Sequence, residues 1–328
     1  EFEGELTTEE AKAFIDDLAE IEIPVLLFSG GEPLMRRDFF ELGKYASKKG
    51  LRSVVSTNGT LITKEAARKM LEAGFKYVGV SLDGLASTHN KFRGMLNAFE
   101  KSILGMKNAM EAGLRTGVRF TITQYNYEEL SDLINYVVKE KIPRFCIYHL
   151  VYSGRGKDII ERDITNEQRI KMIEFLTNKI LELDNNGIEL EILTVDNHAD
   201  GIYLYNYIKK EDPKRAAEVL ELLKMYGGCS AGGKVANVDN LGNVHACQFW
   251  RHLTLGNVKE RKFGEIWYDT NNSFLQMMRN KPAYLKGKCK ICKYNSICGG
   301  CRIRAETIYG DIWQEDPACY LSNDRLTG

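Results

Sequence analysis

Four cysteines stand close together near the C-terminal end of the sequence, in the stretch GKCKICKYNSICGGCRIRAE. Two residues separate Cys289 from Cys292, and two separate Cys298 from Cys301. This spacing lets both thiolates of a pair reach one metal centre, as they do in zinc knuckles and in iron–sulfur sites. The stretch therefore predicts a metal site, and its spacing alone leaves zinc and iron–sulfur clusters open.

The remaining cysteines extend this prediction. Of the eight cysteines in the chain, three more lie in its C-terminal third, at Cys229, Cys247 and Cys319. The first residues are neither a signal peptide nor a transit peptide, so we expect a cytoplasmic protein whose thiols bind metal rather than form disulfides. Zinc sites made of four thiolates use cysteines in multiples of four, and seven cysteines do not divide in this way. The surrounding sequence is rich in glycine and has few helical patterns, which favours iron–sulfur clusters. Cys146 stands alone and is predicted to be a small buried strand residue.

The composition is that of a globular protein with a substantial core. Apolar residues make up 44% and charged residues 27% of the 328 positions, which excludes general disorder. Lys and Arg total 45, and so do Asp and Glu, so the net charge gives no reason to expect a nucleic-acid or membrane partner. No apolar run approaches the roughly 18 residues of a membrane span.

Short apolar runs alternate with helical patterns in the N-terminal two thirds of the chain. Strands are predicted at 24–30, 52–57, 77–84, 117–123, 144–151 and 188–194. Between them, Thr7 with Glu10 and Thr165 with Gln168 have the spacing of helix-capping boxes. Such repeated units, with nearly continuous apolar strands, imply an α/β fold with a parallel sheet, as an open or a closed barrel.

Polar motifs follow three of the predicted strands: SGGEP at 29–33, STNGTLI at 56–62 and SLDG at 81–84. The carboxyl ends of parallel strands are where barrel active sites collect. In this order the motifs resemble those of the radical S-adenosylmethionine (SAM) superfamily, and the cysteine array resembles its SPASM extension, which carries auxiliary [4Fe-4S] clusters. The resemblance implies a radical SAM partial (β/α)6 barrel at residues 1–205 and a C-terminal SPASM-like iron–sulfur domain with a linking helix at 206–328.

The resemblance also implies roles in binding SAM. The residues that match SAM-contacting positions are Gly30, Gly31, Glu32, Pro33, Ser56, Asn58, Ser81 and Asp83. Glycines expose backbone oxygens, and a carboxylate pairs with the methionine ammonium group. Arg119 is the candidate partner of the methionine carboxylate, because a guanidinium can clamp it with two hydrogen bonds. The C-x3-C-x2-C loop that binds the SAM [4Fe-4S] cluster is absent from this sequence, and we expect it upstream of this chain, together with the first barrel strand. The alternative is a degenerate protein that lacks this cluster.

By the same resemblance the cysteines divide between one or two auxiliary [4Fe-4S] clusters. The distal set is Cys289, Cys292, Cys298 and Cys319, and the proximal set is Cys229, Cys247 and Cys301. The proximal set lacks one thiolate. In addition, two residues separate Cys298 from Cys301, whereas the family usually has three residues before this last cysteine. The alternatives for this site are an open iron, a His or carboxylate ligand, or no cluster.

Several longer phrases, among them HNKFRG, YHLVYSGRGKD and DNHADGIYL, narrow the resemblance to radical SAM enzymes that modify tetrapyrroles. This group implies removal of acetate side chains from 12,18-didecarboxysiroheme to give iron-coproporphyrin III, with an electron donor such as ferredoxin or flavodoxin. The alternatives are removal of propionates in haem d1 biosynthesis, a peptide-modifying SPASM maturase and a non-catalytic electron-transfer protein. A flat macrocycle ringed by carboxylates needs aromatic and cationic partners. The pocket candidates are His149, Tyr152, Arg155, Lys157, His198 and His245.

Overall fold

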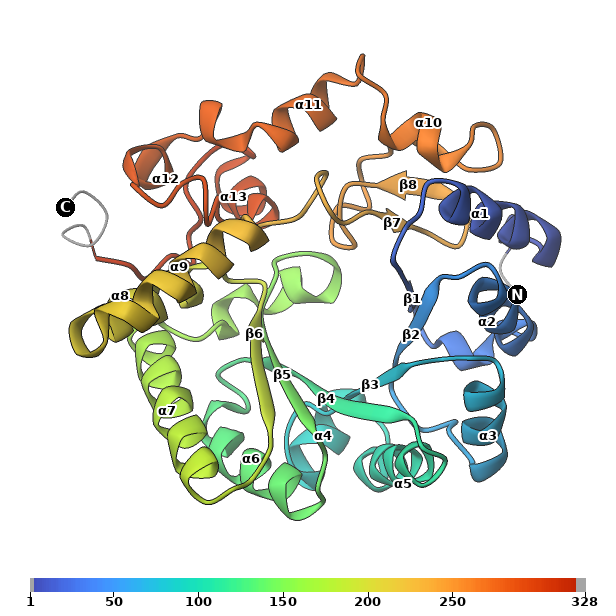
Figure 1. The fold of residues 1–328 in the computed structure, drawn as a ribbon, viewed down its shortest axis with the longest axis horizontal. Helices are drawn as coiled ribbons and strands as arrows, with labels where there is room; N and C mark the ends of the chain where they lie inside the picture. Colours follow the sequence, from blue (N-terminus) through green and yellow to red (C-terminus); the bar gives the residue numbers. More distant parts are fainter. Residues whose placement is uncertain (1–2, 323–328) are drawn as a thin grey trace.

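The computed structural model describes residues 3–322, which are built around a six-stranded sheet. The strands are β1 (Val25–Phe28), β2 (Arg52–Thr57), β3 (Tyr77–Ser81), β4 (Arg115–Ile122), β5 (Arg144–His149) and β6 (Glu191–Val195). Every neighbouring pair is parallel, and the strands follow one another in chain order (Figure 1). Within the described residues β1 and β6 do not pair, so the sheet is an open barrel.

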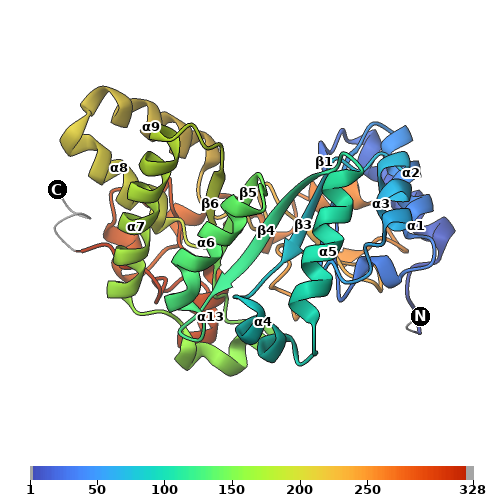
Figure 2. The same cartoon turned by 90° about the horizontal axis from the view of Figure 1, so that it is seen from below.

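Helices connect successive strands and cover the outer face of the sheet (Figures 1 and 2). They are α2 (Phe39–Lys48), α3 (Lys64–Glu72), α4 (Ala86–Arg93), α5 (Ala98–Glu111), α6 (Leu130–Lys139) and α7 (Asn166–Asn185), and a further helix, α1 (Thr8–Glu20), precedes β1. The predicted capping boxes are confirmed at the starts of α1 and α7, where Thr7 and Thr165 accept hydrogen bonds from the backbone N–H groups of Glu10 and Gln168. The alternation of sheet and helix therefore follows signals that are local in the sequence.

The chain after β6 forms two helices and then a region of short elements. These are α8 (Ala199–Glu211), α9 (Pro213–Tyr226), β7 (Asn237–Val238), β8 (Asn243–His245), β9 (Gly256–Asn257), α10 (Phe263–Trp267), α11 (Ser273–Arg279), α12 (Gly287–Ile291) and α13 (Arg302–Tyr309). The sequence around the cysteines was predicted to be nearly free of helices. This is confirmed for residues 292–301 and wrong on both sides of that segment, where α12 and α13 lie. Arg302, Ile303, Arg304 and Ala305 are all buried, so α13 is surrounded by the rest of the protein at its start rather than packed along one apolar side.

The predicted division of the chain into two domains falls within a helix. Residues 205 and 206 both lie inside α8, and residues 1 and 328, where the two predicted domains begin and end, lie outside the described part of the chain. The boundary therefore stays a prediction.

The C-terminal part of the chain contacts both edges of the open sheet (Figure 1). Near β1, Ile15 of α1 packs in one buried cluster with Phe263 of α10. Near β6, the rings of Tyr203 in α8 and Tyr320 lie 5.8 Å apart. Apolar packing at two separated places fixes this part of the chain over the sheet. Among the described residues, no helix is both long and apolar enough to cross a membrane.

Candidate active site and metal centres

Glu32 joins the carboxyl ends of β1 and β2. Its Oε1 accepts a hydrogen bond from Thr57 Oγ1 at 2.6 Å, and its Oε2 accepts one from the backbone N–H of Asn58 at 2.8 Å. Pro33 starts a short 3₁₀ turn, and Glu32 Oε1 also caps that turn by accepting from the backbone N–H of Leu34. A carboxylate has about four lone-pair positions, so Glu32 keeps acceptor capacity for a ligand cation.

The two glycines before Glu32 leave open space above the backbone. Gly30 and Gly31 are exposed, and an added Cβ at either position would meet no atom of the chain within 4 Å. Gly30 also has φ 134°, a conformation that side chains rarely adopt. The backbone oxygens at this turn are therefore accessible to a ligand.

Asp83, just beyond β3, lies at the centre of a buried polar group. Its carboxylate is 2.6 Å from Arg93 Nε, and its backbone N–H donates to Nδ1 of His89 at 2.9 Å. Its backbone oxygen accepts a hydrogen bond from Asn126 Nδ2. Burial raises the pKa of Asp83, and the charge of Arg93 opposes that rise. These contacts favour a positioning role for Asp83, whereas Ser81 at the strand end is only partly buried.

Arg119 lies on the inner face of β4, level with Ser81 on β3 and Cys146 on β5. Its guanidinium carbon stands 4.3 Å from the centre of the Tyr148 ring, a cation–π contact. Its side chain crosses Gly79, where an added Cβ would come within 2.7 Å of Arg119 Cδ. Gly79 therefore leaves space for the side chain of Arg119. Because β1 to β4 are parallel neighbours, the candidate SAM-binding residues on them lie along one edge of the sheet.

The four cysteines of the distal set line one pocket, together with Asn197, Ala199 and Asp316 among other residues. Its empty volume is about 390 Å³. Cys289 Sγ accepts a hydrogen bond from the backbone N–H of Asp316 at 3.4 Å, and Cys292 Sγ accepts one from that of Tyr294 at 3.4 Å. Burial raises the pKa of both thiols, and these N–H donors oppose the rise by favouring the thiolate, the form that binds iron.

The proximal set forms a second group. Cys229, Cys247 and Cys301 pack around a shared cluster of buried side chains that includes Trp250 and Met278. Burial raises the pKa of Cys247 to about 12, and the thiols of Cys229 and Cys301 add to the rise. Thiols affect one another in this way only when they are close. The structure thus brings together the two sets of cysteines that the sequence predicted.

In the part of the chain that the structure describes, no three His, Cys, Asp or Glu side chains stand close enough to hold a single metal ion. In a four-iron cluster each thiolate binds a different iron, so the ligands of a cluster are spaced more widely than those of one ion. The four thiols and the N–H donors of the distal pocket fit such a cluster.

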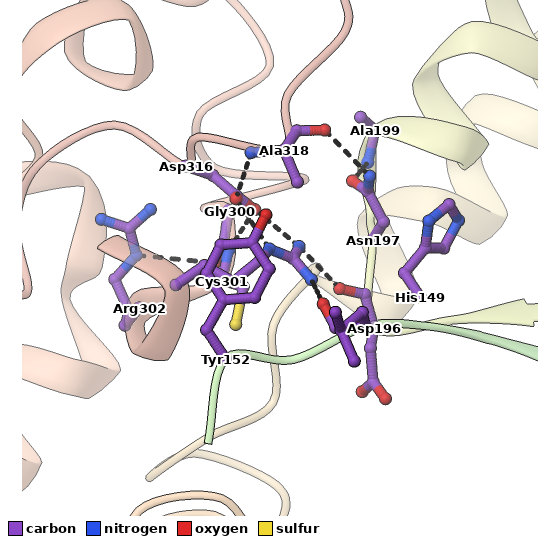
Figure 3. Close-up of polar contacts among 12 residues, drawn as sticks. His149, Tyr152, Asp196, Asn197, Ala199, Gly300, Cys301, Arg302, Asp316 and Ala318 are labelled. Atoms are coloured by element: carbon purple, nitrogen blue, oxygen red, sulfur yellow. Dashed lines mark hydrogen bonds and ion pairs between the residues drawn. The ribbon is translucent and has the colours of Figure 1, made fainter. Parts of the chain in front are cut away.

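One buried ion pair, between Arg304 and Asp316, links Cys301 of the proximal set to the residues that follow β5 and β6 (Figure 3). Asp316 also contacts the distal set, because its backbone N–H donates to Cys289 Sγ. Arg304 holds Asp316 with two hydrogen bonds, Nε to Oδ1 at 2.9 Å and Nη2 to Oδ2 at 2.8 Å. Asp316 Oδ2 also accepts from the backbone N–H of Cys301 at 2.7 Å. Arg304 reaches the sheet as well, donating to the backbone oxygens of Leu150 and Asp196 at 3.2 and 2.8 Å. Both side chains are almost fully buried, so this network is rigid and costly to break.

Known proteins share this combination of sheet and cysteine array. The radical SAM superfamily model matches residues 1–137, and the SPASM iron–sulfur cluster-binding domain matches residues 229–302. The Fe-coproporphyrin III synthase of Methanosarcina barkeri is 48% identical over 330 residues, covering 99% of this chain and 83% of that protein. The chain belongs to the radical SAM superfamily.

Other relatives agree with this assignment. The pre-heme d1 synthase of Dinoroseobacter shibae is 38% identical over 327 residues, covering 98% of this chain and 80% of that protein. The crystal structure of Streptococcus suis SuiB bound to its precursor peptide has the same fold, with a TM-score of 0.75 and 18% identity over 95% of this chain and 69% of that one. This radical SAM enzyme therefore binds SAM and a [4Fe-4S] cluster, and its SPASM domain binds auxiliary iron–sulfur clusters.

Three of the predicted pocket residues of this radical SAM enzyme are buried and engaged within the protein. His149 Nε2 lies 2.8 Å from Asp200, and Tyr152 donates its hydroxyl to Asp163 at 2.7 Å. His245 has an oxygen partner at each ring nitrogen, the backbone oxygen of Leu253 and a carboxylate. These contacts favour structural roles. The others differ: Arg155 and Lys157 are exposed, and His198 is half-buried.

The residues that organise the SPASM region were not identified from the sequence. Arg304 and Asp316 lie close in sequence to the cysteines Cys301 and Cys319, and Asp200 lies in the stretch DNHADGIYL. A charged pair twelve residues apart around α13 was a weak signal, because most such pairs are solvent-exposed. Its burial becomes visible only when the sheet and the SPASM region are placed together.

Proposed function

We propose that this radical SAM enzyme removes the acetate side chains of 12,18-didecarboxysiroheme and so forms iron-coproporphyrin III. The observation that carries the proposal is the 48% identity to Fe-coproporphyrin III synthase, which extends over 99% of the chain. The 38% identity to pre-heme d1 synthase supports the coarser point that the substrate is a tetrapyrrole. We place the reaction in the cytoplasm, with a one-electron donor such as ferredoxin or flavodoxin.

An apolar rim supports a flat, apolar substrate. We define the rim by the exposed side chains that follow the carboxyl ends of β1, β3 and β4: Met35, Phe92, Met95, Leu96 and Tyr125. Leu96 is the most exposed, at 87%. Exposed apolar side chains that follow the carboxyl ends of the strands suit the face of a flat, apolar macrocycle.

Cationic residues stand beside the rim. Arg155 and Lys157 are exposed on the 3₁₀ segment Gly154–Arg162, which follows β5. The guanidinium carbon of Arg162 lies 5.4 Å from the ring centre of Tyr125, so a rim residue and a cation are already in contact. Carboxylates at the edge of the macrocycle would pair with these cations.

The strand-end residues orient SAM below this rim. Gly30, Gly31 and Glu32 receive the amino end of its methionine, and Arg119 receives the carboxylate. When bound, SAM and its cluster supply a 5′-deoxyadenosyl radical that removes a hydrogen atom from the substrate. Loss of hydrogen from the saturated ring carbon beside the carbon that bears methyl and acetate would let the acetate C–C bond break homolytically and a ring double bond form. The departing carboxymethyl radical would take one electron, supplied by the one-electron donor, and one proton, and would leave as acetate.

The test is a single-substrate assay. The protein is reconstituted anaerobically with iron and sulfide and is then incubated with didecarboxysiroheme, SAM and a reductant. The molecular mass of the product is measured by mass spectrometry. Loss of two acetate arms is expected. Loss of propionates instead would assign the protein to haem d1 chemistry, and an unchanged tetrapyrrole alongside 5′-deoxyadenosine formation would contradict the proposal.

A surface variant tests the rim in the same assay. Leu96→Asp places a charge where the macrocycle is expected to lie, and it should raise KM tenfold or more, a loss of about 1.4 kcal/mol in binding. The control is Leu181→Asp, because Leu181 is 55% exposed but lies near the C-terminal end of α7, which leads to the amino end of β6, at the opposite end of the strands. Equal effects of the two variants would exclude the rim as the substrate surface.

A further inference from the structure

Lysines are concentrated in the segment that carries the first two distal cysteines. Residues 286–293 have the sequence KGKCKICK, with no acidic residue and with four lysines: Lys286, Lys288, Lys290 and Lys293. The chain as a whole has equal numbers of acidic and basic residues, so this segment departs from the overall balance. A local excess of positive charge attracts a partner of negative charge.

The lysines lie in and around the distal pocket. Lys288 lines the pocket, and its Nζ lies 3.5 Å from the backbone oxygen of Cys319. Lys286, Lys290 and Lys293 are exposed. Positive charge is therefore present both at the edge of the distal pocket and on the surface outside it.

The carboxylates of Asp311 and Glu315 offset part of this charge. Asp311 pairs with Lys286 at 2.7 Å, and Glu315 accepts a hydrogen bond from the backbone N–H of Lys288 at 2.6 Å. Because four lysines stand against these two acids, the surface keeps a positive excess.

An exposed apolar side chain stands among the lysines. Ile291, the last residue of α12, is 63% exposed. Before α12, the exposed ring of Tyr284 has its centre 5.1 Å from that of Trp313, whose backbone oxygen accepts from the N–H of Lys286 at 2.8 Å. Surfaces that bind proteins combine apolar and aromatic groups with charged groups at the rim. A run of lysines that served solubility alone would not need an exposed isoleucine, so this composition favours a protein partner.

The cations beside the proximal set are placed differently. Lys281, Arg302 and Arg304 are all buried. Lys281 donates to the backbone oxygen of Ala231 at 3.3 Å, and Arg304 is paired with Asp316. These charges act on groups inside the protein. Of the two cysteine sets, the distal one is therefore the set that a charged partner can approach.

We propose that Lys286, Lys288, Lys290, Lys293 and Ile291 form the docking surface for the electron donor, an acidic carrier protein with a flavin or iron–sulfur cofactor. The docked carrier gives one electron to the distal cluster, so the carrier is oxidised, the cluster is reduced, and no bond forms or breaks. Salt should weaken docking, because the charges are exposed and the screening length is only about 10 Å at 0.1 M salt. The inference rests on the one-electron donor of the proposed function, but not on which tetrapyrrole is the substrate.

The test measures binding of two acidic carriers, a flavodoxin and a ferredoxin in their oxidised forms, to the reconstituted protein without tetrapyrrole. Calorimetry at low salt should show binding of at least one carrier, and this binding should weaken as salt is added. The double variant Lys290→Glu/Lys293→Glu should lower the affinity at least about tenfold. The control is Lys44→Glu/Lys48→Glu, which reverses two exposed lysines on α2, at the opposite side of the molecule, and should bind like the wild type (Figure 1). Failure of both carriers to bind the wild type, or equal losses in the two double variants, would overturn the proposal.

Stopped-flow absorption measures the electron transfer itself. The reduced carrier should reduce the clusters of Lys290→Glu/Lys293→Glu at least about tenfold more slowly than those of the wild type. Reduced methyl viologen, a small cation that needs no docking surface, should reduce the variant no more slowly than the wild type, and iron content should be unchanged. Slower reduction by viologen as well would mean that the lysines act on the cluster and not on the carrier. Binding of the wild type to vesicles of anionic phospholipid, lost in the same variant, would assign the surface to a membrane and would also contradict the proposal.

Discussion

The two functional regions of this protein are built in opposite ways. At the strand ends, Gly30 and Gly31 are exposed and short connections present them on an open sheet. In the SPASM region, the cysteine ligands come from distant segments and are fixed by buried charges, above all Arg304 and Asp316. The register of parallel strands positions the first region, whereas a few polar contacts inside the protein position the second.

This difference matches the two kinds of ligand. SAM and the substrate must enter and leave, so their contacts lie at accessible turns. An iron–sulfur cluster stays bound, and its potential depends on exclusion of water and on fixed N–H donors, so its ligands are enclosed. Substitutions should therefore affect folding in the SPASM region and ligand affinity at the strand ends.

The largest effect is expected from Arg304→Met. It leaves the carboxylate of Asp316 buried without its partner, so the free energy of unfolding should fall by about 3 to 5 kcal/mol. It also releases Leu150 and Asp196, so iron binding at both cysteine sets should fall together. Denaturant unfolding and iron content measure the two effects.

The control for Arg304→Met is Arg115→Met. Arg115 pairs with Glu191 at 2.7 Å, but its side chain is 51% exposed, so the loss should stay below about 1 kcal/mol. If Arg304→Met cost no more than this control and kept its iron, the buried pair would not be what holds the SPASM region in place.

The same contrast explains what the sequence could predict. The parallel sheet and the placement of SGGEP, STNGTLI and SLDG at strand ends followed from local signals, because parallel strands bring their carboxyl ends to one edge. The grouping of the cysteines came from a family resemblance, and the pocket of the distal set and the packing of the proximal set agree with it.

Side-chain environments were harder to predict. His149, Tyr152 and His245 were selected for their chemistry, and the fold buries all three against internal partners. Their partners Asp200 and Asp163 stand 51 and 11 residues away in sequence, and no local pattern links residues at such distances. The role of Arg304 was missed for the same reason, since its contacts on the sheet lie more than a hundred residues earlier.

A medium effect is expected from Gly31→Ala, which tests the strand-end side of the comparison. Its added methyl group would meet no atom of the chain within 4 Å, so stability should be unchanged. The methyl group would occupy space that bound SAM needs, so SAM affinity should fall at least tenfold, about 1.4 kcal/mol. Equilibrium dialysis with labelled SAM measures the affinity. The control is Gly233→Ala, whose Cβ would have only an ordinary contact at 3.7 Å, and an equal loss in both variants would remove Gly31 from the SAM site.

The smallest effect is expected from His89→Gln, and it concerns the pH dependence of the free energy of unfolding. The variant tests whether the strand-end region titrates in a pH range where the buried ion pair of the SPASM region does not. Burial, with the charge of Arg93 adding to it, lowers the pKa of His89 from 6.5 to about 4, so the folded protein keeps this ring neutral where the unfolded chain would protonate it. The unfolded state then binds more protons, and stability should fall as pH drops below 6.5, by about 1 kcal/mol between about pH 7 and pH 5.5. Glutamine can still accept the hydrogen bond from the backbone of Asp83 and does not titrate.

Urea unfolding at the two pH values, in the wild type and in His89→Gln, measures that difference. Arg304 outweighs the effect of burial and holds the pKa of Asp316 well below its usual range, so the ion pair of the SPASM region does not titrate in this window. The ion pair should therefore add nothing to the pH dependence of the wild type, and His252→Gln, at an exposed histidine, should behave like the wild type. An identical pH dependence in wild type and His89→Gln would mean that another group carries the titration and that the two regions do not differ in this respect.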